Sequence, residues 1–432
     1  MINSKSCVES IGHTSRLRSS LGDVGGQSSL TALVRFCRDR LWGPFRDSIS
    51  EAYHKQHYPL GYSAGLDGLR GLMTLGVIAA HANYNFMPGS VIFIDIFYVM
   101  SGYFITGLLI KDVKRYGKVR FFQFYSRRFC RLLPPLAAMI VGFLLFSYLY
   151  FPDFRKPAVD AAIGFCYVAN WWRAFDWPGI AYMGHTWSLA IEEQFYLLWP
   201  LTFVILFRLF GLGWRLVAAI LTIALAIWAW RFWMTWHGAP FKRLYNGFDT
   251  RADALMVGCA LAVVLAFVSL ENRPTFDRIL KLLAWPILVI GLTFTFYFLD
   301  WQHPAYYYAG IVFVGTALGI LLVLILIRPL DTVLHRVLEL SVLVFFGRIF
   351  YAMYLWHWPM VLILWHDLGW PVWLRFAVTY PLTILLAVLS YVLIERHFMR
   401  AKGRGKPAIA DEVGHPAPAP ASLDGRRVPQ FR

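Results

Sequence analysis

The chain has 432 residues, of which 58% are hydrophobic and only 15% charged, and its mean hydropathy is +0.53. This composition excludes a soluble globular protein with a polar shell and indicates a polytopic membrane protein. The formal charge of +16 would suggest a nucleic-acid ligand in a soluble protein. Here positively charged cytosolic loops explain most of it, so we expect no nucleic-acid partner.

Ten apolar stretches are long enough to cross a hydrocarbon core of about 30 Å. In chain order they are residues 68–86, 91–110, 132–151, 186–207, 214–234, 252–269, 283–299, 306–327, 341–365 and 372–394. The sequence therefore predicts an all-α membrane bundle of about ten transmembrane helices within residues 61–398. A shorter apolar piece at 158–172 contains Asp160 and ends in Trp171-Trp172-Arg173, which is typical of a re-entrant or interfacial segment.

Basic residues predict the orientation of this bundle. The loop between the second and third helices is crowded with Lys and Arg against a single acid, Asp112, so it is predicted to be cytosolic. The same bias in the other even-numbered loops places both termini in the cytosol, although Lys242 and Arg243 lie against the trend. Residues 1–60, which lack a signal-peptide core, and residues 399–432 are predicted cytosolic tails, the first partly disordered and the second disordered.

The first predicted helix carries Arg70 and His81. Eleven residues at about 100° and 1.5 Å each come within roughly 20° of three full turns, so both side chains share one face about 16 Å apart. Charged or titratable groups inside a membrane normally face a protein interior or a cavity, which makes the pair a candidate functional site. The alternative is that Arg70 reaches the interface as a topology signal and His81 is a packing residue.

Several other classes of protein are disfavoured. The sequence has no Walker-type phosphate loop, no Rossmann glycine fingerprint and no GxSxG nucleophile motif, which argues against an ATP-driven pump, a dinucleotide enzyme and a serine hydrolase. Its five cysteines form no CxxC pair and no cluster with metal-ligand spacing. We therefore expect no metal and no tightly bound cofactor.

Six segments in order resemble the acyltransferase-3 family of bacterial membrane O-acyltransferases: GLDGLRG with its Arg-x10-His spacing, FIDIFYVMSGYFIT, YSRRFCRLLPP, HTWSLAIEEQFYLLWP, RADALMVGCALA and GRIFYAMYLWHWP. The resemblance covers about residues 61–398. It implies transfer of an acyl group, usually acetyl from acetyl-coenzyme A, to hydroxyls of envelope or exported glycans at the bacterial inner membrane. The chain departs from the family at Ile349-Phe350, where members often show a serine before the tyrosine, and in its long N-terminal tail.

The resemblance and helix geometry together suggest a site for the donor. Arg128 and Arg131 are three residues apart, share a helix face and lie at the level of Arg70. Arginine suits bidentate phosphate binding, and coenzyme A carries a pyrophosphate and a 3′-phosphate. We therefore predict that these three arginines bind acyl-coenzyme A, the alternative being a basic belt that faces anionic lipid.

His81 is the candidate general base, because a neutral imidazole can take a proton from an attacking hydroxyl; a covalent acyl-histidine is an open alternative. Glu192 and Glu193 point about 100° apart on a helix, so only one faces a given site. The family match favours Glu192, at a depth comparable to that of His81, where it would orient His81 or bind the acceptor hydroxyl. The alternative for Glu192 is a buried carboxylate paired with an Arg or a Tyr for folding.

A polar pocket for the acceptor is predicted near the outer helix ends. Its candidate residues, which include possible oxyanion donors in the SGY segment, are Asp95, Ser101, Tyr103, Arg251, Asp253 and His357. Each also has a structural interpretation: Arg251 and Asp253 could pair locally, and His357 between two tryptophans could be a core histidine.

The function predicted from sequence is thus a membrane O-acyltransferase that moves acetyl from cytosolic acetyl-coenzyme A to an envelope or exported polysaccharide or glycolipid. The main alternative is a transporter of a glycan intermediate or small organic acid that uses the same charged cavity, and a third is a catalytically silent scaffold. The sequence leaves open the acceptor, the acyl group and the oligomeric state. Membrane lipids are expected partners.

Overall fold

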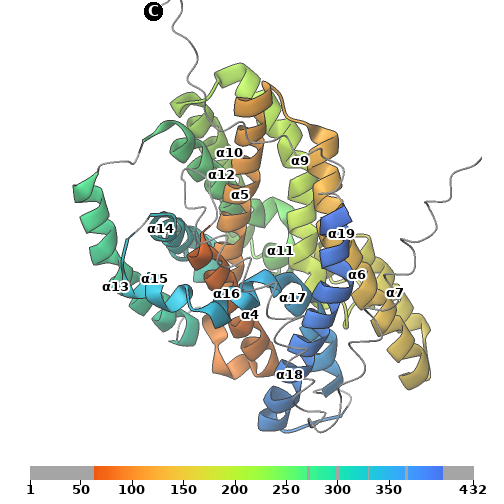
Figure 1. Cartoon of the computed structure of the whole chain (residues 1–432). Helices are drawn as coiled ribbons and strands as arrows, with labels where there is room; N and C mark the ends of the chain where they lie inside the picture. Colours follow the sequence, from red (N-terminus) through yellow and green to blue (C-terminus); the bar gives the residue numbers. More distant parts are fainter. Residues whose placement is uncertain (1–62, 270–272, 298–300, 329, 365–367, 402–432) are drawn as a thin grey trace, which may run out of the picture.

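The computed structural model describes residues 63–401 apart from 270–272, 298–300, 329 and 365–367, and the secondary-structure elements of this part of the chain are all helices (Figure 1). The all-α prediction is therefore confirmed for the described residues. The predicted tails lie outside this part, except that the last helix continues to Ala401. The cytosolic location of the two termini stays a prediction.

The longer helices form the body of the molecule. They are α4 (Ala64–Ala82), α5 (Ile92–Tyr116), α6 (Phe121–Tyr150), α9 (Trp187–Phe210), α10 (Trp214–Trp236), α12 (Phe248–Phe267), α13 (Pro274–Tyr297), α17 (Phe350–Leu362) and α18 (Val372–Ser390). Shorter elements connect or extend them: α7 (Arg155–Phe165), α8 (Ala169–Ala174), α11 (Phe241–Asn246), α14 (Ala317–Leu326), α15 (Val333–Leu338), α16 (Ser341–Arg348) and α19 (Arg396–Ala401).

Six helical stretches in the described part are long and apolar enough to cross a membrane. They are Pro88–Tyr116, Phe121–Tyr150, Gly184–Phe210, Trp214–Trp236, Phe241–Phe267 and Val372–Phe398. A multi-pass membrane protein is thus confirmed, but the predicted count of ten is not. One reason is that the apolar stretches at 306–327 and 341–365 are each divided into two shorter helical pieces.

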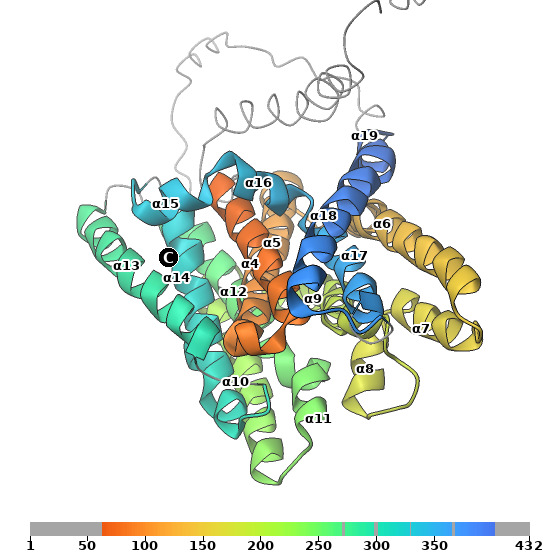
Figure 2. The ribbon, with the colours of Figure 1, turned by 90° about the horizontal axis from the view of Figure 1, so that it is seen from below.

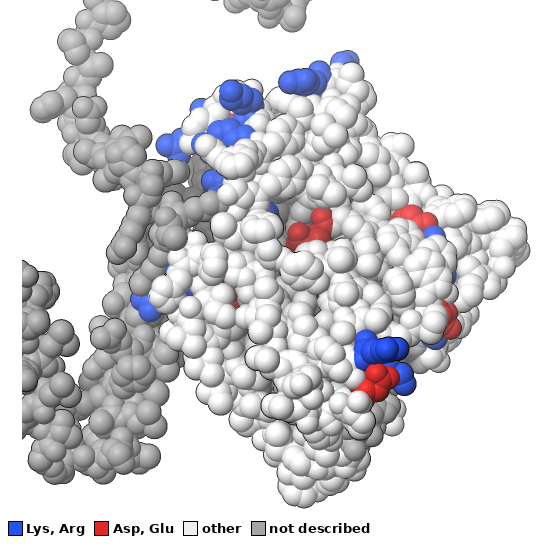
Figure 3. Space-filling view, turned by 90° about the vertical axis from the view of Figure 1, so that its right-hand side faces the viewer, with Lys and Arg blue, Asp and Glu red and all other residues white. Residues whose placement is uncertain are grey.

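The helices lie side by side, with α4, α5 and α12 in the middle (Figures 1 and 2). Seen from below, α13 and α14 lie on one side of this centre and α6 and α7 on the other (Figure 2). The outer face shown in Figure 3 is largely free of charged side chains, as expected of a surface in contact with lipid. Lys and Arg gather along its upper edge, the end at which α5 joins α6. The sequence predicts this end to be cytosolic.

Glycine allows the two central helices to pack closely. A Cβ atom on Gly102 of α5 would lie 2.0 Å from the carbonyl oxygen of Leu255, and one on Gly258 of α12 would lie 2.0 Å from that of Val99. Both distances are far below van der Waals contact, so no other residue fits at either position without moving the helices apart. Small residues at such crossings are typical of membrane helices.

Glycines also allow close packing at the start of α4, where Gly68 of the GLDGLRG segment and Gly347 of α16 meet backbone atoms. A Cβ on Gly68 would lie 1.6 Å from the carbonyl oxygen of Leu338, and one on Gly347 would lie 1.8 Å from that of Asp67. The start of α4 therefore packs directly on the backbone of α15 and α16. This contact explains why the helix predicted over 341–365 is interrupted: α16 crosses α4, and after a non-helical Ile349 the chain continues as α17 beside α18.

The stretch predicted at 306–327 begins as a π-helical segment, Tyr306–Thr316, and becomes α-helical as α14. Side chains of α10 bind carbonyl groups of this segment: Arg231 Nε donates to the oxygen of Tyr307 over 3.0 Å, and Trp228 Nε1 donates to that of Tyr308 over 2.9 Å. In a π-helix the backbone hydrogen bonds join residues five apart instead of four. In this segment, carbonyl oxygens also accept hydrogen bonds from the side chains of α10.

Candidate active site

The three predicted donor-site arginines line one cavity of about 300 Å³. Arg70 comes from α4 and is fixed by a 2.8 Å ion pair to Asp67, while its guanidinium lies 4.4 Å from the centre of the Phe104 ring. Arg128 and Arg131 come from one face of α6, as their spacing predicts, and Lys111 adds a fourth cation. We call this space the arginine cavity.

Within the part of the chain that the structure describes, neither Arg128 nor Arg131 forms an ion pair. The guanidinium of Arg128 instead lies over the Tyr196 ring, 4.3 Å from its centre. An aromatic face supports a guanidinium without using its N–H donors. The arginine cavity therefore offers fork-shaped donors suited to phosphate oxygens.

Glu192 lines the arginine cavity, and the structure does not place it beside His81. Its Oε1 accepts a 2.6 Å hydrogen bond from Ser101, whose hydroxyl also lies 2.7 Å from that of Tyr196. Tyr103 lines the same cavity. The prediction that Ser101 and Tyr103 belong to an outer acceptor pocket is therefore wrong, because both line the arginine cavity. The predicted contact by which Glu192 would orient His81 is not present either.

His81 pairs with another predicted residue, His357 of α17. His81 Nδ1 lies 2.9 Å from His357 Nε2, and His357 Nδ1 lies 2.6 Å from the carbonyl oxygen of Tyr354. A carbonyl oxygen only accepts hydrogen bonds, so His357 Nδ1 must carry a proton. In a neutral ring the Nε2 of His357 then has no proton, and it accepts a hydrogen bond from His81 Nδ1. The hydrogen-bond pattern therefore assigns His81 the tautomer in which Nε2 has a free lone pair.

A second cavity of about 180 Å³ is lined by His81 and by residues of α5, α8, α9 and α17. We call it the histidine cavity. Trp358 forms part of its wall and meets the His81 ring edge-on, 4.7 Å between ring centres. A few polar side chains in a cavity lined mainly by aliphatic and aromatic residues are a common arrangement for a ligand site.

Two residues of the histidine cavity have no role in the sequence-based prediction. His185 is buried, and its ring centre lies 5.6 Å from that of His357; it is the first residue of the family-like segment HTWSLAIEEQ, which was the available signal. Arg173 of α8 lines the cavity too, although its Trp-rich surroundings suggested only a membrane edge. The two come from short elements whose position relative to α4 cannot be read from local sequence.

Asp160 of α7 holds the loop that supports this cavity. Its Oδ2 accepts backbone hydrogen bonds from Ala181 over 2.8 Å and from Tyr182 over 2.7 Å, while Trp358 Nε1 donates to the oxygen of Ala181 over 2.9 Å. Burial raises the pKa of Asp160 to about 6, against the opposing effect of these backbone donors. Asp160 therefore connects α7 to the indole that faces His81.

A narrow space of about 40 Å³ lies between the two cavities. It shares Glu192 and Phe97 with the arginine cavity, and Val77 and Tyr354 with the histidine cavity. The three spaces thus form one series along α4, in the direction from Arg70 to His81. Figure 3 also shows an acidic side chain inside a hollow in the middle of the face drawn there.

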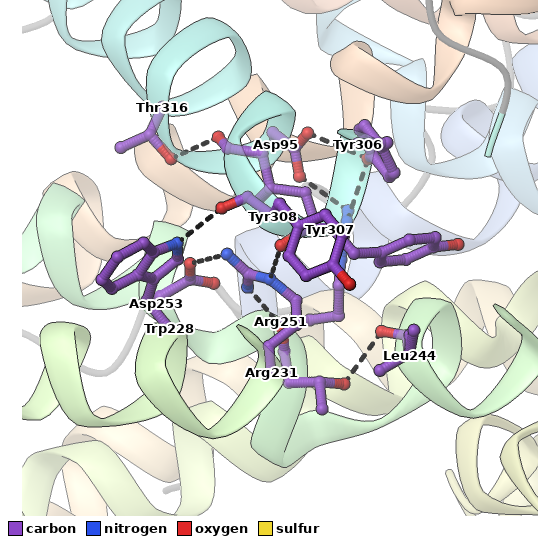
Figure 4. A network of polar contacts seen from close by, with 12 residues as sticks. Asp95, Trp228, Arg231, Leu244, Arg251, Asp253, Tyr306, Tyr307, Tyr308 and Thr316 are labelled. Carbon is purple, nitrogen blue, oxygen red and sulfur yellow. Dashed lines mark hydrogen bonds and ion pairs between the residues drawn. The ribbon is translucent and has the colours of Figure 1, made fainter. Parts of the chain in front are cut away.

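The other predicted acceptor residues form a buried ion-pair network, shown in Figure 4, and line none of these three spaces. Arg251 pairs with Asp95 over 2.6 Å, and both side chains are 0% exposed. Tyr306 donates to Asp95 over 3.0 Å. Asp253 pairs with Arg231 of α10 over 2.7 Å, so the alternative of a local pair between Arg251 and Asp253 is wrong too. Two residues apart on α12, the side chains point about 200° apart and so reach different helices.

Among the described residues, no group of three or more His, Cys, Asp or Glu side chains is arranged to hold a metal ion. The fold and site define a multi-pass membrane protein with a cationic cavity, a histidine cavity and a narrow space between them that shares wall residues with both. The chain belongs to the acyltransferase-3 family: the family's acyltransferase domain matches residues 63–392. The resemblance seen in its motifs is thereby confirmed.

Named relatives agree with this assignment. Peptidoglycan O-acetyltransferase OatA of Listeria monocytogenes is 33% identical over 318 residues, which are 70% of this chain and 50% of the relative. The putative peptidoglycan O-acetyltransferase YrhL of Bacillus subtilis is 32% identical over 80% of this chain and 56% of its own. O-acetyltransferase OatA of Staphylococcus aureus is 30% identical over 80% and 58%. The chain spans about half the length of these relatives, and no solved structure matches it.

Proposed function

We propose that this protein is a membrane O-acetyltransferase that moves acetyl from cytosolic acetyl-coenzyme A to a hydroxyl of a cell-envelope glycan. The observation that carries the proposal is the series of spaces from three arginines to a histidine with a free Nε2. Arg70 and His81 are eleven residues apart on α4, about 16 Å along the helix axis. Phosphate recognition and acyl transfer are thus separated along one route.

In the proposed reaction, the phosphates of acetyl-coenzyme A bind Arg70, Arg128 and Arg131, and the thioester extends through the narrow gap toward His81. The acceptor hydroxyl attacks the thioester carbonyl carbon while His81 Nε2 takes its proton. The carbon–sulfur bond then breaks, and His81 Nε2 returns the proton to the departing sulfur, so that coenzyme A leaves as the free thiol. His357 accepts the hydrogen bond from His81 Nδ1, which leaves Nε2 of His81 free to take the proton.

The names of two relatives specify peptidoglycan, which makes peptidoglycan the first envelope glycan to test as acceptor. The test is transfer of radiolabelled acetyl from acetyl-coenzyme A to envelope glycans in membranes bearing the wild type, His81→Ala or His237→Ala at matched protein levels. His237 is exposed at the end of α10 and is the control. Label incorporated by the wild type and by His237→Ala but not by His81→Ala supports the proposal, and equal label in all three contradicts it.

A transporter is the second candidate, because neighbouring spaces that share wall residues also suit passage of a solute. It predicts uptake of a glycan intermediate or organic acid by vesicles without any need for coenzyme A. Release of free coenzyme A in step with acylated glycan would exclude it.

A further inference from the structure

Arg173 gives the histidine cavity a permanent positive charge. Its side chain lines the cavity together with His81 and His185, and no Asp or Glu is among the lining residues. Among the described residues, Arg173 forms no ion pair; Asp176, the acid nearest in sequence, binds Lys242 at the surface instead. A cation without a carboxylate partner beside an enclosed space is a candidate binding group for an anion.

The guanidinium is held so that part of its donor set stays available. Arg173 Nε donates to Asn246 Oδ1 over 3.0 Å, and the amide of Asn246 is itself fixed because its nitrogen donates to the oxygen of Lys242 over 2.8 Å. A Cβ on Gly184 would lie 2.9 Å from Arg173 Nη1. The absence of a side chain at Gly184 therefore makes room for the tip of Arg173, whose terminal N–H groups are not used by Asn246.

The surroundings of Arg173 suit a sugar. Trp187, Trp301 and Tyr245 line the cavity along with Trp358, and aromatic rings provide apolar faces for packing against a ring. A Cβ atom on Gly184 would also lie 3.8 Å from Trp358 Nε1. The centre of the Trp358 ring lies 4.7 Å from that of the His81 ring. Arg173 and His81 thus line the same cavity without direct contact, and Trp358 lies near both, which suits binding of a substituent of the acceptor by Arg173 rather than of the reacting oxygen.

We propose that Arg173 binds a carboxylate of the acceptor, so that the histidine cavity selects an acidic sugar and presents its hydroxyl to His81. This inference rests on the proposed function. The planar fork of a guanidinium matches a carboxylate. A phosphate would carry more negative charge, and the residues that line this cavity include no second Lys or Arg to balance it. A carboxylate-bearing sugar is therefore the class of acceptor that the cavity fits.

The test compares two soluble probes that differ in one charge. The first is the disaccharide of N-acetylglucosamine and N-acetylmuramic acid with its free lactyl carboxylate, and the second is its methyl ester. Binding of each to the purified full chain in lipid nanodiscs is measured by calorimetry for the wild type, Arg173→Gln, Arg173→Lys and the control Arg127→Gln. Arg127 is exposed on α6 and does not line the cavity.

The wild type and Arg127→Gln are expected to bind the acid about 10-fold or more tightly than the ester, as for one charge-assisted hydrogen-bonded pair. Arg173→Gln should bind the acid and the ester equally. Arg173→Lys should keep part of the preference for the acid, and this remaining preference would show that a substitution at position 173 leaves the cavity folded. The proposal is overturned if the wild type binds neither probe or does not discriminate, or if Arg173→Gln still discriminates.

Transfer is measured separately on the same two probes. A loss of kcat in Arg173→Gln that is equal for acid and ester, with unchanged binding, would assign Arg173 to the transition state and overturn the carboxylate site. Discrimination in binding without any acetyl transfer by the wild type, to these probes or to envelope glycans, would instead contradict the proposed function and leave the site standing.

Discussion

The rings of His81 and His357 are nearly parallel, with 3° between their planes, and Nδ1 of His81 lies 2.9 Å from Nε2 of His357. His357 is in turn fixed by the carbonyl oxygen of Tyr354. Two helices that are far apart in sequence, α4 and α17, thus share one hydrogen-bonded chain. In it a neutral histidine has the orienting position that a carboxylate occupies in many hydrolases.

Removing the acceptor for His81 Nδ1 should slow the reaction without weakening donor binding. We expect His357→Ala to lower kcat about 10²-fold, because His81 loses its fixed tautomer and orientation, while the KM for acetyl-coenzyme A stays unchanged. His357→Gln, whose amide oxygen can accept the same hydrogen bond, should recover part of the rate. Steady-state kinetics on the purified protein checks this, and an equal loss in both variants would show that His357 acts through packing alone.

The arginine cavity predicts a separate effect on the donor. Arg128→Gln or Arg131→Gln should raise the KM for acetyl-coenzyme A about 10-fold, since each removes a charged donor to phosphate. Arg127→Gln on the same helix turn is the control, because its side chain is exposed and does not line the cavity. A similar rise in the control would mean that a general basic surface attracts the donor, and the assignment of the cavity would fail.

The buried pair of Asp95 and Arg251 should matter for folding. Asp95→Asn leaves a guanidinium without its charge partner in a fully buried position, which costs about 3–5 kcal/mol. Thermal unfolding in detergent should therefore show a large loss of stability. Asp331→Asn breaks the exposed pair with Arg336 and should leave the unfolding temperature unchanged. A stable Asp95→Asn protein without transfer activity would return Asp95 to the active site.

Asp160 predicts a dependence of stability on pH. Its pKa of about 6 in the folded protein lies above its ordinary value of 3.8, so between these values the unfolded chain releases the proton first. Stability should fall by on the order of 2–3 kcal/mol as the pH rises from about 4 to about 6, and then change no further from this source. Asp160→Asn should lack this fall when unfolding temperatures are compared at pH 4 to 7, and parallel curves for the two proteins would contradict the assignment.

Much of the helical framework could be predicted because apolar length is a local property. The break at Ile349 could not, since it depends on the contact of Gly347 with the backbone of Asp67. An apolar run by itself does not show where another helix will cross it. The π-helical start at Tyr306 is similar, because side chains of α10 bind its carbonyl groups.

The candidate site divides in the same way. Helix rise gives the depth of each residue in the membrane, which predicts that Arg70, Arg128 and Arg131 come together at one level. Depth does not show which way a side chain points. It predicts a common pocket for Asp95, Arg251 and Asp253, whereas the structure directs them into ion pairs between helices. His185 and Arg173 do not follow from depth, because they lie on short elements held by contacts between residues far apart in sequence, such as the hydrogen bond from Arg173 to Asn246.

The gap between the two cavities has a consequence for the chemistry of the donor. Its free volume is only about 40 Å³, and Phe97, Phe350 and Leu189 are among its walls. On the proposed route every thioester must pass these side chains before it meets His81. The gap would then act as a sieve for acyl groups: it favours a two-carbon acetyl, and smaller residues at its walls would be the means to make the enzyme accept longer chains.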